Sequence, residues 1–310
     1  MHPDQPSSAE TRFLELKGGV VAYTDEGSGP ILLCIHGIPG SKADFRWLAP
    51  ALIPKLRVLR IDLPGFGDTP RAAHPYPGME SMALFVLQFS KAMKIERFAL
   101  LGHSLGGTIA TQAATDDRVF ALALLSSAGP YSHRGHFPKT YKFLVPFANN
   151  PFSRPLIVFL GKRILRWVGF RIGDSDENLL AALECAASID FKQHGGTLNL
   201  LAKPTMIAWA KDDRMVESKV GESLTQISPP GPRLYFDTGG HNIQKTRAIE
   251  IADTLCPWVQ ESSNRNDAKA ELILPISICE AGGAQLIGPV ERNLENHRPK
   301  KACDFLFKIS

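Results

Sequence analysis

A serine stands between glycines in the segment Gly-His-Ser-Leu-Gly at 102–106, a spacing that suits a nucleophile. The segment follows an apolar run at 98–101 and precedes a helical pattern of small residues at 106–114. Glycines two positions before and after a serine let the backbone turn tightly, so that the hydroxyl projects from the turn. A glycine-rich turn with a surface serine would carry the same letters, but the preceding strand and following helix favour Ser104 as a nucleophile.

Acyl transfer from a serine places negative charge on a carbonyl oxygen, which N–H donors can stabilise. The N–H of Leu105, at the start of the helix after Ser104, is one candidate donor. The second candidate is the N–H of Ile38, which follows His-Gly after an apolar run at 31–35, although a plain strand-exit turn would also fit. The residues expected to support these loops are His36, Gly37, Gly102, His103 and Gly106.

A serine is a poor nucleophile at neutral pH without an adjacent base. His241 is the candidate base, because it follows two glycines after a strand pattern at 233–236. The imidazole in turn needs a carboxylate that holds its tautomer and stabilises its charge. Asp212 and Asp213 both follow a strand pattern at 206–210, and their positions alone leave both open.

These residues need a scaffold that brings the ends of several strands together. Short apolar runs alternate with helical patterns over the first part of the chain, which predicts an α/β fold with a mostly parallel central sheet and helices on both faces. Strands are expected near 13–16, 20–24, 31–35, 57–63, 98–101, 121–125, 206–210 and 233–236, and helices near 43–52, 80–93, 106–114 and 244–260. The candidate residues all follow predicted strands.

The alternation stops between about 130 and 200, where helical patterns occur without a convincing strand. We therefore predict a core domain at 12–130 and 201–262, a helical cap at 131–200, and a C-terminal tail at 263–310 of unknown structure, which could be disordered.

Composition excludes several classes of protein. The 310 residues are 44% hydrophobic and 21% charged, as in ordinary globular proteins, and a net charge of +4 is too small to favour nucleic-acid binding. The five cysteines form no CxxC pair, which argues against a disulfide framework or zinc site. With no apolar signal core or membrane-spanning run, we expect a cytoplasmic protein that needs no metal or organic cofactor.

The segment 131–171 has an unusual composition, with eight Lys or Arg, six Phe and no Asp or Glu. One hypothesis is a pocket for an apolar acyl or aromatic substrate, lined by Phe137, Phe143, Phe147 and Trp167. A second is contact with an anionic membrane surface. The plainer interpretation is a stripe of Ile157, Leu160, Ile164 and Val168 packed on the core, with a solvated basic face.

Five segments together resemble the α/β-hydrolase superfamily over about residues 12–262. They are His-Gly-Ile-Pro-Gly at 36–40, Asp-Leu-Pro-Gly-Phe-Gly-Asp at 62–68, Gly-His-Ser-Leu-Gly-Gly at 102–107, Trp-Ala-Lys-Asp-Asp-Arg-Met-Val at 209–216, and Gly-His at 240–241. The resemblance is to serine esterase-like members with a helical cap, and the order Ser, Asp, His is also theirs. It implies that Asp213 is the acid. Ala210 replaces the family's usual glycine, and nothing carries over to the tail.

The resemblance implies hydrolysis of a carboxylic ester or related acyl compound through an acyl-enzyme at Ser104. Relatives with the same first loop include epoxide hydrolases and haloalkane dehalogenases, but those use an aspartate where this chain has Ser104. A cofactor-free haloperoxidase or perhydrolase, or a C–C bond hydrolase, could use the same triad. A ligand receptor or scaffold on the same fold is the non-enzyme alternative.

Overall fold

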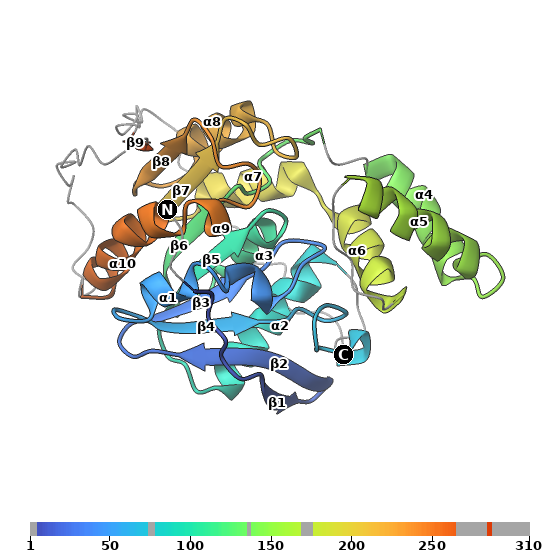
Figure 1. Cartoon of the computed structure of the whole chain (residues 1–310), viewed down its shortest axis with the longest axis horizontal. Coiled ribbons are helices and arrows are strands. Elements are labelled where there is room, and N and C mark those ends of the chain that lie inside the picture. The colour runs from blue at the N-terminus through green and yellow to red at the C-terminus, as the bar shows by residue number, and fades with distance from the viewer. Residues whose placement is uncertain (1–4, 74–77, 135–137, 169–175, 265–283, 287–310) are drawn as a thin grey trace, which may run out of the picture.

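The computed structural model describes residues 5–73, 78–134, 138–168, 176–264 and 284–286. In this part of the chain one sheet has the strand order β1-β2-β4-β3-β5-β6-β7-β8-β9 (Figure 1). The strands are β1 (Arg12–Leu16), β2 (Gly19–Glu26), β3 (Ile31–Ile35), β4 (Arg57–Ile61), β5 (Phe98–His103), β6 (Val119–Leu125), β7 (Thr205–Ala210), β8 (Arg233–Phe236) and β9 (Ala284–Leu286). Strands β3 to β8 pair in parallel, while β1, β2 and β9 are antiparallel to their neighbours. The predicted fold class is confirmed.

Helices cover both faces of the sheet, because the parallel strands are apolar on both sides. Leu32 and Cys34 of β3 pack into one core with α1 and α10, whereas Leu33 and Ile35 pack into the other with α2 and α3. The helices of the described residues are η1 (Lys42–Phe45, 3-10), α1 (Ala49–Leu52), η2 (Arg71–Ala73, 3-10), α2 (Met79–Ala92), α3 (Gly106–Ala113), α4 (Pro138–Asn149), α5 (Arg154–Val168), α6 (Asp176–Ser188), α7 (Phe191–Leu200), α8 (Ser218–Ile227), α9 (Ile243–Thr246) and α10 (Ala248–Asn264).

Four of these helices, α4 to α7, lie between β6 and β7, where the sequence predicts the insertion. Helices α4 and α5 pack on one another and on α6, and in Figure 1 they stand at the right-hand edge of the molecule, beyond α6. Arg71 of η2 ties this unit to the rest of the chain, because it pairs with Glu177 and Glu184 of α6. Within the unit, Arg154 of α5 pairs with Glu177 of α6. A separate cap domain over the site stays a prediction.

Some predicted element boundaries are wrong. The helix expected at 43–52 is split into η1 and α1, with Pro50 in the first turn of α1, where its missing N–H costs no helical bond. The helix expected at 244–260 is also two helices, which meet at Arg247. Part of the expected tail forms β9 against β8, and the apolar stretch at 272–278 lies outside the described residues.

None of the described helices is both long and apolar enough to cross a membrane.

Candidate active site

The order of the strands brings the candidate residues to one edge of the sheet. β3 and β5 are neighbours, so the loop after β3 and the turn after β5 leave the sheet side by side. The loops after β7 and β8 carry Asp213 and His241 toward the same carboxyl edge. In open parallel sheets the switch in strand order, here at β3 and β5, is where ligands bind.

Ser104 sits at a strained turn between β5 and α3, with a φ of 53° that non-glycine residues rarely adopt. Small neighbours make the turn possible. A Cβ on Gly102 would lie 2.6 Å from the Cα of Gly107, and a Cβ on Gly106 would lie 2.2 Å from the carbonyl oxygen of His36. Larger side chains at these glycines would therefore push α3 and the β3 loop away from Ser104.

A continuous chain of hydrogen bonds joins the three candidate side chains. His241 Nε2 lies 2.9 Å from Ser104 Oγ, and His241 Nδ1 lies 2.8 Å from Asp213 Oδ2. The carboxylate can only accept, so Nδ1 carries the proton and Nε2 accepts from the serine hydroxyl. Within the neutral imidazole this is the tautomer that can remove a proton from Ser104.

Asp213 is held as a carboxylate by the groups around it. Burial by itself would raise the pKa of Asp213, but the hydrogen bond and charge of His241 and the N–H groups of Val216 and Met215 outweigh it, so the pKa is lowered. Those two N–H groups donate to Oδ1 at 2.9 and 2.7 Å, which leaves Oδ2 for His241. An ionised carboxylate at this position stabilises positive charge on the imidazole.

Asp212 has a different partner. Its Oδ1 accepts a hydrogen bond of 2.7 Å from the N–H of Gly240, the residue before His241. The geometry therefore distinguishes the two carboxylates, because Asp213 contacts the imidazole and Asp212 contacts the loop backbone. Asp212 therefore holds the backbone next to the candidate base.

His103, one residue before Ser104, also contacts the His241 loop. Its Nε2 donates to the carbonyl oxygen of His241 at 3.0 Å. Burial, and then the nearby charge of His241, lower the pKa of His103 to about 3. The ring is therefore neutral over the ordinary pH range, and it acts as a fixed donor to the loop that carries His241.

The candidate oxyanion loop lies against Ser104. A Cβ on Gly37 would lie 3.0 Å from Nδ1 of His103 and 3.1 Å from the Cβ of Ser104, so these neighbours would have to shift by a few tenths of an ångström. Ile38 and Leu105 are both buried, and the N–H of neither donates to another group within the described part of the chain. Such N–H groups next to a serine hydroxyl are available to a negatively charged oxygen.

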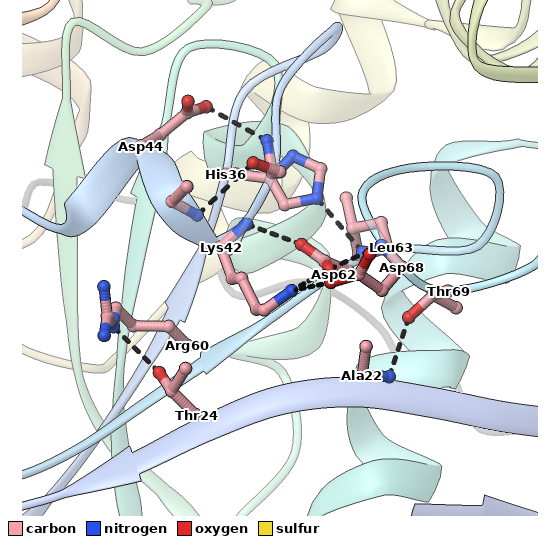
Figure 2. A network of polar contacts seen from close by, with 12 residues as sticks. Ala22, Thr24, His36, Lys42, Asp44, Arg60, Asp62, Leu63, Asp68 and Thr69 are labelled. Carbon is pink, nitrogen blue, oxygen red and sulfur yellow. Dashed lines mark hydrogen bonds and ion pairs between the residues drawn. The ribbon is translucent and has the colours of Figure 1, made fainter. Parts of the chain in front are cut away.

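His36 fixes the start of this loop. It is fully buried, and its Nε2 accepts from the N–H of Leu63 at 3.0 Å (Figure 2). Its Nδ1 lies 2.7 Å from the carbonyl oxygen of Gly37. Because a carbonyl only accepts, Nδ1 is the protonated nitrogen. His36 thus links the loop after β3 to the loop after β4 and contacts neither Ser104 nor His241 by a hydrogen bond.

Figure 2 also shows a buried ion pair that sequence reasoning missed. Lys42 Nζ binds Asp62 Oδ2 at 2.7 Å and Asp68 Oδ2 at 2.6 Å, while the Lys42 N–H donates to Asp62 Oδ1. Burial alone would lower the pKa of Lys42, but its bonds to Asp62 and Asp68 raise it. The sequence offered one signal for this ion pair, because Lys42 comes two positions after the segment 36–40 and both aspartates belong to the segment 62–68.

The predicted substrate pocket gains no support from the described residues. Phe137 and the side chain of Trp167 lie outside them, and Phe143 and Phe147 are exposed on α4. Their rings pack against each other, with centroids 5.2 Å apart. The pocket therefore stays a prediction.

A cavity of about 360 Å³ lies elsewhere, between α2, α3 and the α6–α7 connection. Its lining includes Met79, Thr108, Ser188 and His194 and none of the three side chains of the candidate triad. Among the residues that the structure describes, no cluster of His, Cys, Asp and Glu has the arrangement of a metal site.

The chain resembles known proteins over most of its length. The α/β hydrolase fold family matches residues 30–151. The chain is 33% identical over 234 residues to the pimeloyl-[acyl-carrier protein] methyl ester esterase of Aeromonas hydrophila, which covers 69% of this chain and 89% of that protein. It is 26% identical over 262 residues to the magnesium-chelatase 30 kDa subunit of Rhodobacter capsulatus, and this match covers 77% of this chain and 90% of that protein.

Solved structures show the same architecture. A thermophilic esterase from Thermogutta terrifontis aligns with a TM-score of 0.64 at 18% identity, over 82% of this chain and 99% of that one. At this identity the likeness concerns the fold, so the chemistry depends on the residues described above.

Proposed function

Because the chain belongs to the α/β-hydrolase fold family, we propose that it is a serine hydrolase that cleaves a carboxylic ester or a related acyl compound. The observation that carries this proposal is the hydrogen-bonded chain from Ser104 through His241 to Asp213. This order of hydroxyl, imidazole and carboxylate is what activates a serine for attack on a carbonyl carbon.

In the proposed reaction, Ser104 Oγ attacks the carbonyl carbon while His241 Nε2 takes the hydroxyl proton. Asp213 stabilises the imidazolium, and the N–H groups of Ile38 and Leu105 donate to the oxyanion. His241 then gives its proton to the leaving oxygen, and the alcohol departs. Water attacks the acyl-enzyme with His241 again as base, which releases the acid and restores Ser104.

An ester is the favoured substrate class. The phenylalanine-rich segment 131–171 favours a small molecule with an apolar acyl or aromatic part. The name of the Aeromonas hydrophila relative, a methyl ester esterase, supports ester cleavage, since that protein is 33% identical to this chain. An aspartate at position 104 would favour the epoxide hydrolase or dehalogenase reaction, and the serine found there favours acyl transfer.

The proposal is tested with p-nitrophenyl esters of graded acyl-chain length. Wild-type protein is expected to hydrolyse at least one chain length, and Ser104→Ala is expected to lower kcat by a factor of about 10³ or more, because the acyl-enzyme cannot form. Ser8→Ala, which changes an exposed serine, is the matched control and should keep the wild-type rate. Equal rates for wild type and Ser104→Ala would refute the mechanism, and a ligand receptor would turn over none of the esters.

A further inference from the structure

Exposed apolar side chains gather on α4, α5 and the turn between them. Of the eleven large hydrophobic side chains that are exposed in the described residues, seven belong to this segment, and Phe152 in the turn is 94% exposed. We call this set the α4–α5 surface: Phe143, Phe147, Phe152, Leu156, Phe159, Leu160 and Ile164. Exposed apolar side chains that gather on one unit mark an interaction site more often than exposed apolar side chains scattered singly.

Helix α5 has two apolar faces, and only one of them is covered. Val158 and the half-buried Ile157 pack with α6, and a Cβ on Gly161 would lie 2.8 Å from Leu179. The other face carries Leu156, Phe159, Leu160 and Ile164, which recur at the spacing of one side of a helix.

One of the interpretations of the sequence packs Leu160 and Ile164 on the core, and the structure corrects it. Both are exposed, because the contact of α5 with α6 turns the face of Val158 and Gly161 inward instead. The stripe therefore faces solvent and not the core.

Cations lie on the same two helices, α4 and α5. Lys139, Lys142 and Arg163 are exposed, and no carboxylate of the described residues forms an ion pair with them. The guanidinium of Arg163 lies 6.0 Å from the ring centroid of Phe159, so charge and aromatic surface are contiguous. The acids nearby are used elsewhere, because Lys162 pairs with Asp176 and Arg154 with Glu177.

We propose that the α4–α5 surface binds a membrane that contains anionic lipids. The phenylalanines and leucines would enter the boundary between headgroups and acyl chains, while the three cations contact lipid phosphates. Charge favours this occupant over a second copy of the chain. A symmetric dimer places the same patch of both subunits together, and would bring like charges face to face.

The contributions of the two kinds of residue differ in size. Each cation near an anionic surface is expected to strengthen binding about fivefold, an effect that salt screens. Each phenylalanine that leaves water is expected to contribute roughly tenfold or more, with little salt dependence. Binding should therefore need both anionic lipid and the exposed rings.

The test is co-sedimentation of the full chain with vesicles of phosphatidylcholine and phosphatidylglycerol in equal parts, compared with phosphatidylcholine alone. Wild type is expected to bind the anionic vesicles, and high salt is expected to weaken the binding. Phe152→Ser with Phe159→Ser should lower the partition coefficient about a hundredfold. Phe13→Ser should not, although Phe13 on β1 is 61% exposed, about as much as Phe159 at 59%.

A charge series completes the test. Lys139→Gln with Lys142→Gln should weaken binding to anionic vesicles about twenty-fivefold, and Lys17→Gln with Lys91→Gln, an equal change in net charge at exposed sites, should not. Failure of wild type to sediment with anionic vesicles would overturn the proposal. So would a dimer in size-exclusion chromatography that Phe152→Ser with Phe159→Ser dissociates, since the surface would then be occupied by a second copy. Catalytic activity does not enter either readout, so this test is independent of the proposed hydrolase reaction.

Discussion

Asp212 and Asp213 are adjacent in the chain, yet their carboxylates hold different groups. Asp213 accepts from the imidazole of His241, whereas Asp212 accepts from the N–H of Gly240. Sequence position alone could not separate them, because a loop pattern does not predict which way each of two adjacent side chains points. Only the resemblance to a known family pointed to Asp213.

Paired substitutions should separate the two roles. Asp213→Asn removes the charge that stabilises the imidazolium and allows the wrong tautomer, so kcat is expected to fall by about 10²- to 10⁴-fold. Asp212→Asn keeps an oxygen that can accept from Gly240 and should cost only a few-fold. Ester hydrolysis with both variants is the measurement. A loss for Asp212→Asn as large as that for Asp213→Asn would show that the assignment is reversed.

At the scale of elements, the loops around Ser104 depend on contacts between segments far apart in the chain. The ion pair of Lys42 with Asp62 joins η1 to the loop after β4, and His36 joins that loop to the one after β3. Asp62 is fully buried, so its charge depends on the partners that surround it. Lys42 and Asp62 are twenty positions apart in the chain, so the periodicity of the sequence does not predict that they pair.

Removing the cation should therefore destabilise the fold. Lys42→Met leaves the Asp62 carboxylate buried without its ion pair, and is expected to lower the free energy of unfolding by about 3–5 kcal/mol. Urea denaturation measures the change. Lys42→Met with Asp62→Asn should recover part of the loss, because the uncompensated charge is gone. Asp68→Ala, which removes a largely exposed partner, should cost about 1 kcal/mol or less. Equal losses for Lys42→Met and Asp68→Ala would contradict the buried pair as the source.

Other elements were predictable to different degrees. The parallel strands are short apolar runs covered on both faces, so their positions could be read from sequence, and the fold class followed. Strand β9 could not, because three residues far from β8 in the chain carry no strand pattern of their own. The covered face of α5 was also misassigned, since that helix is apolar on two sides and only tertiary contact decides which side is buried.

At the scale of the whole molecule, buried neutral histidines make stability depend on pH. Burial lowers the pKa of His103 to about 3 and that of His194 to about 4, from an ordinary value of 6.5. Below pH 6.5 these two histidines bind protons in the unfolded chain but stay neutral in the folded protein. Their contribution to stability is therefore full above pH 6.5 and is lost progressively as the pH falls toward 4 and 3.

His194 allows this to be measured away from Ser104. Its Nε2 lies 3.2 Å from the carbonyl oxygen of Ala128, a bond that the amide of His194→Gln could replace. Between pH 6 and 4.5, wild type is expected to lose up to about 1.4 kcal/mol per pH unit more than the variant, as followed by urea denaturation. Identical slopes for the two proteins would mean that His194 takes up its proton in the folded state.

The central claim is that Ser104 is an activated nucleophile, and covalent labelling tests it most directly. A fluorophosphonate reacts with a serine that a neighbouring base has activated, so intact-mass measurement should show one adduct per chain and peptide mapping should place it on Ser104. Ser104→Ala should not label, and Asp213→Asn should label far more slowly. A wild-type protein that takes up no probe, or whose adduct maps to another serine, would contradict the proposed mechanism.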